Sequence, residues 1–128
     1  MTITASQALA VVRVAIGLTM LIHGVSRLVH GGVAPFGGFL DSRGFPFGVG
    51  IAWAITLIEI LASPLLIAGR FVRPIGFYFA FQLAMGIALV HFPEGWFVVG
   101  AGRNGMEFSA LLIGCFIAVA LASPGRRK

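Results

Sequence analysis

IAWAITLIEILASPLLIAGR, residues 51–70, is apolar and long enough to cross a bilayer, yet it carries Glu59 near its middle. A carboxylate at that depth is disfavoured by about 2.5–3.5 kcal/mol on insertion scales. The rest of the chain must therefore supply polar partners for it. Two further polar residues lie inside apolar stretches, Arg13 and Gln82. We expect the helices to gather around Glu59.

The composition indicates an integral membrane protein of the all-α class. Hydrophobic residues make up 59% of the 128 residues and charged residues only 10%, whereas soluble domains have about 25% charged residues. This length suits a single domain over residues 1–128. The net charge of +5 comes from basic residues scattered in turns beside apolar segments. That placement follows the positive-inside pattern, so we expect the lipid bilayer, and no nucleic acid, as a partner.

Four apolar segments predict a four-transmembrane-helix bundle. The expected spans cover about residues 6–29, 49–68, 75–92 and 106–122. Gly31 and Gly32 should end the first span, which we expect to remain uncleaved, and Gly69 should cap the second. Between these spans, VAPFGGFLDSRGFPFG at 33–48 combines Gly, Pro and four Phe residues. This composition predicts a segment that lies at the membrane interface or is re-entrant.

The flanking charges predict the orientation of the spans. With four spans, both termini and the 70–73 turn lie on one side, which carries five basic residues: Arg70, Arg73, Arg126, Arg127 and Lys128. The opposite side carries three: Arg27, Arg43 and Arg103. The excess favours cytoplasmic termini.

Counting residues from the span ends predicts an inner polar layer. Arg13, Glu59 and Gln82 should lie at one level, roughly 10–15 Å from the inner boundary at about 1.5 Å per residue. Arg13 is then the expected ion-pair partner of Glu59, because each buried ion needs an opposite charge. The pair could be a structural pin that fixes helix register, or it could have a direct functional role.

The same counting predicts an outer layer near the opposite boundary. It holds two imidazoles, a carboxylate and two guanidiniums: His23, Arg27, His91, Arg103 and Glu107. Such a set suits a ligand-binding or proton-handling pocket. The alternative is that His23 and His91 are interfacial residues bonded to backbone or water. No helical HxxxH or ExxH pair occurs and the guanidiniums would repel a cation, so we expect no metal.

Residues along most of the chain resemble the DoxX family of membrane proteins. The matching pieces are RVAIG at 13–17, His23-Gly24, Glu59, LIAG at 66–69, Arg73, Met85, HFP at 91–93, GWF at 95–97 and GME at 105–107. Two positions depart from the family pattern: Arg27 stands where Lys is common, and Ala62-Ser63-Pro64 replaces a Gly-rich stretch. The resemblance implies a four-helix protein of the bacterial inner membrane.

The resemblance also implies a redox context. Related proteins form a quinone-reducing subunit of a thiosulfate oxidoreductase or associate with a superoxide dismutase and a sulfurtransferase. The function expected first is therefore a membrane subunit of a redox complex, linked to quinone or to oxidative and thiol stress. The sequence shows no flavin, haem or cysteine-cluster motif, and its single cysteine, Cys115, excludes an intramolecular disulfide. Partner proteins would therefore have to deliver electrons.

Two other functions remain open. One is a non-enzymatic anchor or assembly subunit, whose polar layers fix the helices while its loops dock a partner. The other, ranked third, is a small-molecule transporter, for which the sequence shows no inverted repeat. Whether the chain is an enzyme at all, which residues would be catalytic, and whether it forms a homo-oligomer are left open by the sequence.

Overall fold

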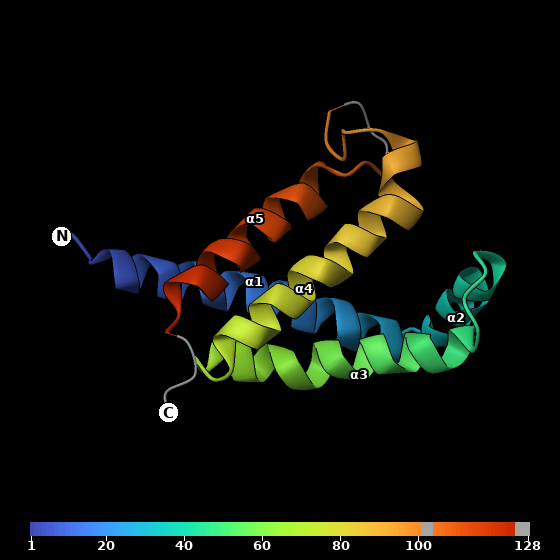
Figure 1. Cartoon of the computed structure of the whole chain (residues 1–128), viewed down its shortest axis with the longest axis horizontal. Helices are drawn as coiled ribbons and strands as arrows, with labels where there is room; N and C mark the ends of the chain where they lie inside the picture. The colour runs from blue at the N-terminus through green and yellow to red at the C-terminus, as the bar shows by residue number, and fades with distance from the viewer. Residues whose placement is uncertain (101–103, 125–128) are drawn as a thin grey trace. The chain divides into compact units, whose positions relative to one another are not determined.

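The computed structural model describes residues 1–100 and 104–124, which form helices and turns with no strand. Figure 1 shows the α-helices in chain order: α1 (Ala5–Val29), α2 (Val33–Ser42), α3 (Gly48–Ile67), α4 (Val72–Gly86) and α5 (Glu107–Ala122). A π-helical turn, Ile87–His91, and a 3-10 turn, Phe92–Glu94, follow α4. The expected all-α class is thus confirmed, and the helix ends agree closely with the predicted spans except in two regions.

The first exception is the segment at 33–48, which contains a helix of its own. Gly31 ends α1 in the left-handed conformation, with φ +69°, and the N–H of Gly32 donates to the carbonyl of Arg27 at 2.7 Å. This is the Schellman arrangement that satisfies the last carbonyls of a helix. Pro35 then lies in the first turn of α2, where no intrahelical N–H bond is lost. The segment at 33–48 thus contains a ten-residue helix, and its interfacial or re-entrant placement stays a prediction.

The second exception is the start of α4, which begins three residues before the predicted span. Pro74 lies in the first turn of the helix rather than in the preceding turn. Phe71, just before α4, adopts a left-handed conformation with φ 54°. The predicted cap at Gly69 is confirmed, with φ +81° and the next N–H, from Arg70, donating to Leu65. The connection between α3 and α4 is therefore a very short turn.

The chain divides into two compact units, and α1 contributes to both. The first, here called the α1–α3 unit, is Gly17–Arg70. In it α2 packs on the first half of α3 around Val33, Leu40 and Ala52. A side chain on Gly48 would collide with the Gly37 carbonyl, so the two segments approach closely at these glycines.

The second, here called the α4–α5 unit, combines Met1–Ile16 with the chain from Phe71 onward. Helices α4 and α5 pack along their length (Figure 1). The rings of Phe79 and Phe116 are buried in this contact with centroids 5.3 Å apart. Gly76 permits the close approach, because a Cβ there would lie 3.0 Å from the Cβ of Ala120.

Three helical stretches are long and apolar enough to cross a membrane: Ala5–Val29, Gly48–Ile67 and Val72–Glu94. Helix α5 is also apolar but has only 16 residues. Large hydrophobic side chains are exposed along all four, among them Ile22, Leu61, Phe81 and Leu111. Exposed apolar surface on this scale is typical of helices that face lipid.

Candidate functional site

Two glycines set the register between α1 and α3. A Cβ on Gly17 would lie 2.6 Å from the Ile67 side chain, and one on Gly24 would lie 2.8 Å from the Cβ of Glu59. The glycines are seven residues apart, two helical turns, so they share one face of α1. The opposing face of α3 is the buried stripe of Thr56, Glu59 and Ser63. Helical periodicity groups the residues of each face, and the structure packs the two faces together.

The carboxylate of Glu59 forms an ion pair with Arg27. Nη1 of Arg27 donates to Oε1 of Glu59 at 2.8 Å and to Oγ1 of Thr56 at 3.1 Å. The Thr56 hydroxyl in turn donates to the Ala52 carbonyl at 2.7 Å. The side chain of Glu59 is 1% exposed and that of Arg27 is 22% exposed. A charge-assisted hydrogen bond with so buried an acceptor ties the end of α1 firmly to the middle of α3.

An aromatic ring from α2 completes this cluster. The guanidinium carbon of Arg27 lies 4.8 Å from the centroid of the Phe36 ring, within the range of a cation–π interaction. Arg27 therefore contacts α2 and α3 at once while belonging to α1. We call Arg27, Phe36, Thr56 and Glu59 the Arg27 cluster.

The structure pairs Glu59 with Arg27, whereas the sequence favoured Arg13 as its partner. Arg13 lies in the other unit, so its pairing with Glu59 stays a prediction. Counting from span ends assumes that each side chain lies at the depth of its own Cα. The glycine contacts place Gly24 opposite Glu59, and helical side chains lean toward the N-terminus of their helix. The long side chain of Arg27 thus reaches back to the level of Gly24 and meets the carboxylate.

The other members of the predicted inner layer lie in the α4–α5 unit. Nε of Arg13 and Oε1 of Gln82 are both buried, and neither has a hydrogen-bond partner among the described residues. Glu59 belongs to the other unit. The grouping of these three residues in one layer therefore stays a prediction.

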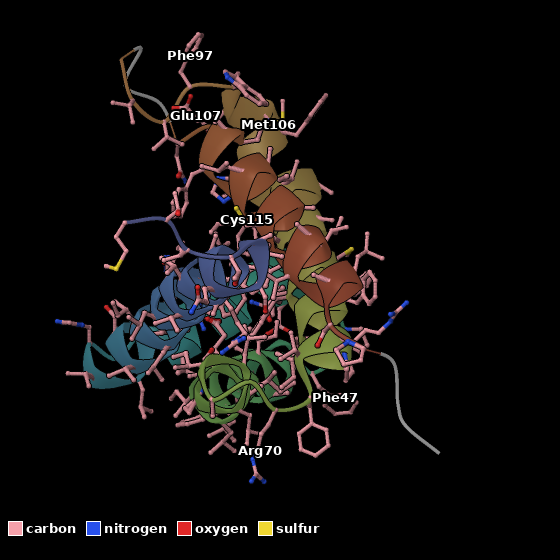
Figure 2. The ribbon with its side chains drawn as sticks, turned by 90° about the vertical axis from the view of Figure 1, so that its left-hand side faces the viewer. Phe47, Arg70, Phe97, Met106, Glu107 and Cys115 are labelled. Carbon is pink, nitrogen blue, oxygen red and sulfur yellow. The ribbon has the colours of Figure 1, made fainter. Side chains whose placement is uncertain are left out.

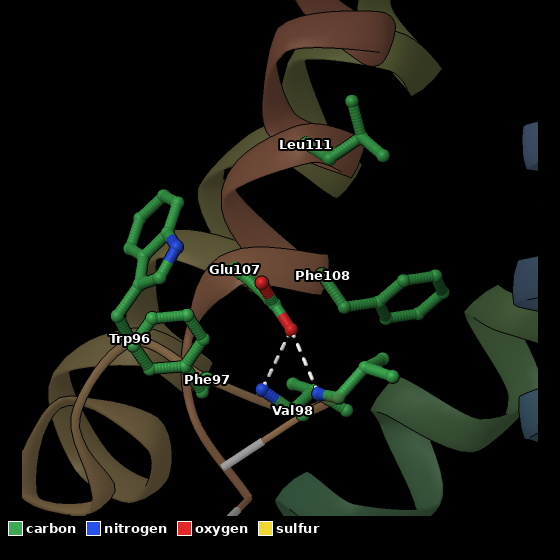
Figure 3. A pocket seen from close by; sticks show the side chains of 8 residues that line it. Trp96, Phe97, Val98, Glu107, Phe108 and Leu111 are labelled. Carbon is green, nitrogen blue, oxygen red and sulfur yellow. Dashed lines mark hydrogen bonds between the residues drawn. The ribbon is translucent and has the colours of Figure 1, made fainter.

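Glu107, a member of the predicted outer layer, closes a loop in the α4–α5 unit. Its Oε1 accepts the backbone N–H of Val98 at 2.7 Å and that of Val99 at 2.8 Å (Figure 3). Three backbone bonds brace the same loop: Gly105 N–H to Phe97, Met106 N–H to Gly95, and Glu107 N–H to Trp96. Figure 2 shows Phe97, Met106 and Glu107 at the same end of this unit. Among the described residues, the hydrogen bonds to the carboxylate all end on Oε1.

An open, largely apolar cavity of about 630 Å³ lies beside Glu107. Its lining comes from the loop and the first turns of α5: Trp96, Phe97, Val98, Val99, Gly100, Glu107, Phe108 and Leu111 (Figure 3). Among the described residues, Glu107 is the one charged residue in this lining. Cavities of this size that are apolar with few polar groups are typical of small-molecule sites.

The remaining predicted site residues are distributed over the two units. His23 is exposed on α1, in the α1–α3 unit. His91 lies in the π-helical turn of the α4–α5 unit, with Nδ1 3.0 Å from the Asn104 carbonyl oxygen. Arg103 is outside the described residues. Each unit therefore holds part of the predicted outer layer, and its assembly into one pocket stays a prediction.

The part of the chain that the structure describes contains no cluster of three or more His, Cys, Asp or Glu side chains suited to a metal ion.

The π-helical turn around His91 is a local feature that often marks functional sites.

Residues 8–92 match the model of the DoxX family, which is more than half of the chain. The chain belongs to the DoxX family. The match includes the complete Arg27 cluster, while the Glu107 loop and cavity follow it. No curated protein and no solved structure matches the chain. Family membership and the apolar helices together identify a multi-pass membrane protein.

Two features of this DoxX protein were missed by sequence reasoning. Phe36 was recognised only as an interfacial aromatic, because its contact with Arg27 depends on the turn that folds α2 back toward α1. The bonds from Val98 and Val99 to Glu107 involve backbone groups, which carry no residue-type signal. Thr56 lies three residues before Glu59, so helical periodicity places both on one face, and this spacing is the sequence signal for its place in the cluster.

Proposed function

We propose that this DoxX protein is a membrane subunit of a redox complex and that the cavity beside Glu107 binds a quinone. The observation that carries the proposal is the open cavity itself, in which the described apolar and aromatic side chains flank the carboxylate of Glu107. A quinone has a flat apolar ring with polar oxygens at two edges, and such walls suit the ring. The cavity volume of about 630 Å³ is within the range of small-molecule sites.

The proposed role of the chain is to bind the ring and manage protons. Reduction of a quinone to a quinol consumes two electrons and two protons. No electron-carrier motif is visible in the sequence, so a partner protein would supply the electrons. Oε1 of Glu107 holds the loop, and among the described residues Oε2 is the carboxylate oxygen left to exchange a proton with a quinone oxygen.

The proposal includes a placement in the membrane. We propose a four-helix arrangement in the bacterial inner membrane, with both termini cytoplasmic. Helix α5 is short for a span, since 16 residues rise about 24 Å against a hydrocarbon core of about 30 Å. Residues flanking α5 would have to complete this fourth span.

Photolabelling with an azido-quinone tests the site in membranes that contain the protein with its native partners. Leu111→Trp should block labelling and quinone-linked activity, because Leu111 lines the cavity. Leu121→Trp is the matched control: it places the same side chain at an exposed position of the same helix, outside the cavity lining. Labelling lost in the Leu111 variant and retained in the control supports a quinone site. Equal labelling of both variants contradicts it.

Glu107→Gln tests the proton role separately from the fold. The amide oxygen of Gln can still accept the N–H groups of Val98 and Val99, so the loop should persist. The amide cannot take up a proton, so quinone-linked turnover should fall by about 10²–10⁴-fold while labelling remains. Unchanged turnover would exclude Glu107 as the proton-exchanging group.

The second candidate function is a non-enzymatic anchor or assembly subunit. It is favoured by the structural use of the charged residues, since Glu59 is held by Arg27 and Glu107 holds its own loop. This function predicts that partner proteins co-purify with the chain in gentle detergent and that no quinone is labelled. It also predicts that Leu111→Trp leaves the activity of the complex unchanged.

A further inference from the structure

We propose that Arg27 and Arg43 bind the phosphate head group of an anionic membrane lipid. Arg27 and Arg43 lie at the end of the α1–α3 unit where α1 meets α2, and both have N–H groups that could bind a phosphate. This phosphate site is independent of the proposed quinone site, which lies in the other unit.

The guanidinium of Arg27 has donors to spare. A guanidinium carries five N–H donors. Among the described residues, both side-chain hydrogen bonds of Arg27 start from Nη1, one to Thr56 and one to Glu59. Nε and Nη2 therefore still present N–H groups, on a side chain that is 22% exposed. At a membrane face, such free donors can bind the phosphate of an anionic lipid.

Arg43, the residue just after α2, places a second guanidinium beside this helix. Its guanidinium carbon lies 5.8 Å from the centroid of the Phe39 ring, as that of Arg27 lies 4.8 Å from Phe36. Phe36 and Phe39 are three residues apart on α2 and so are neighbours on its surface. The two rings thus hold two guanidiniums near one side of a short helix.

Asp41 and Glu59, the carboxylates near these arginines, already have partners. Asp41 is engaged with the backbone, since its Oδ1 accepts the N–H of Gly48 at 2.9 Å. Glu59 balances Arg27, which leaves Arg43 as an exposed guanidinium without a carboxylate partner in the described part of the chain. Arginine binds phosphate through paired N–H groups. Aromatic rings at the interface and adjacent basic side chains are the features that recognise lipid head groups.

The position in the membrane identifies the source of the phosphate. Helices α1 and α3 run antiparallel, because Gly17 meets the end of α3 and Gly24 meets its middle. Both are long enough to span a bilayer, so α2 at their shared end lies at a membrane face. The lipid phosphate layer is at that depth. A phospholipid head group is therefore the favoured occupant, and free phosphate is the competing source.

Native mass spectrometry of the full chain, delipidated and reloaded with phosphatidylglycerol, tests the site. Arg43→Ala should reduce lipid retention about fivefold, which corresponds to the loss of one basic contact at a membrane surface. Arg27→Lys keeps a cation for Glu59 but lacks the planar fork, so it should also weaken retention. Arg43→Ala carries the test alone where the Arg27 variant fails to fold, since the Arg43 side chain is exposed.

Arg70→Ala is the matched control, because it removes an equal charge from the exposed turn at the other end of α3. Retention that falls in the Arg43 variant and not in the control supports the site. Equal retention in wild type and the Arg43 variant, or an equal fall in the control, overturns it. Competition with glycerol phosphate separates the two sources: displacement of the lipid at equal concentration would show a free-phosphate site and contradict the lipid assignment.

Discussion

At the scale of single residues, the buried carboxylate of Glu59 connects α3 to α1. Its ion pair with Arg27 joins residues 32 positions apart in the chain. A buried ion pair adds little net stability compared with an apolar pair of similar volume, but removal of one partner leaves an uncompensated charge. We therefore expect the pair to fix the alignment of α1 and α3 more than to add net stability.

This asymmetry predicts the outcome of a double-mutant cycle. Arg27→Leu alone should lower the free energy of unfolding by about 3–5 kcal/mol, because Glu59 stays buried without its guanidinium. Glu59→Leu combined with Arg27→Leu should be markedly more stable than the single Arg27 variant. SDS-induced unfolding in mixed micelles measures the unfolding free energies of the two single variants and the double variant, with Arg70→Leu as an exposed control. A double variant as unstable as the sum of the singles would contradict this role for the pair.

At the scale of helices, small residues decide which faces meet. Gly24 is buried where a Cβ would lie 3.2 Å from the Thr56 carbonyl oxygen and closer still to Glu59. Neither neighbour is the free end of a flexible side chain, so the helices would have to separate. Gly86 in α4 has no atom within 4 Å of its Cβ position.

Substitution by alanine should therefore have opposite effects at these two glycines. Gly24→Ala should cost about 1–3 kcal/mol through overpacking of α1 against α3. Gly86→Ala should be neutral or stabilising by up to about 1 kcal/mol, from helix propensity alone. The same SDS unfolding assay compares them, and equal effects at both positions would argue against the α1–α3 contact.

Two phenylalanines just before helix starts adopt a left-handed backbone conformation. Phe47 and Phe71, the residues just before α3 and α4, have φ values of 56° and 54° and exposed side chains. A non-glycine residue is strained in this conformation. Phe71→Gly should therefore be more stable than Phe71→Ala by about 1–2 kcal/mol, since both lose the ring and only glycine relieves the backbone. Equal unfolding free energies for the two variants would show that position 71 is unstrained.

At the scale of the whole molecule, the membrane arrangement is the property to establish. With four spans, the C-terminus and the turn between α2 and α3 lie on opposite sides. A fluorescent protein fused after Lys128 should be bright, and alkaline phosphatase fused there should be inactive. Phosphatase inserted in the turn after Gly44 should be active. The reverse pattern would invert the topology, and activity at both positions would exclude four spans.

The sequence by itself determined the class of this protein and most of its helices. Hydropathy and helical periodicity are local properties, so the apolar segments, the glycine caps and the faces of Gly17, Gly24, Thr56 and Glu59 could be predicted. Only the tertiary structure decided that Arg27 pairs with Glu59, that α2 packs on α3, and that Glu107 binds the backbone of Val98 and Val99. These contacts depend on helix register and side-chain direction, and they join segments that the order of residues alone does not bring together.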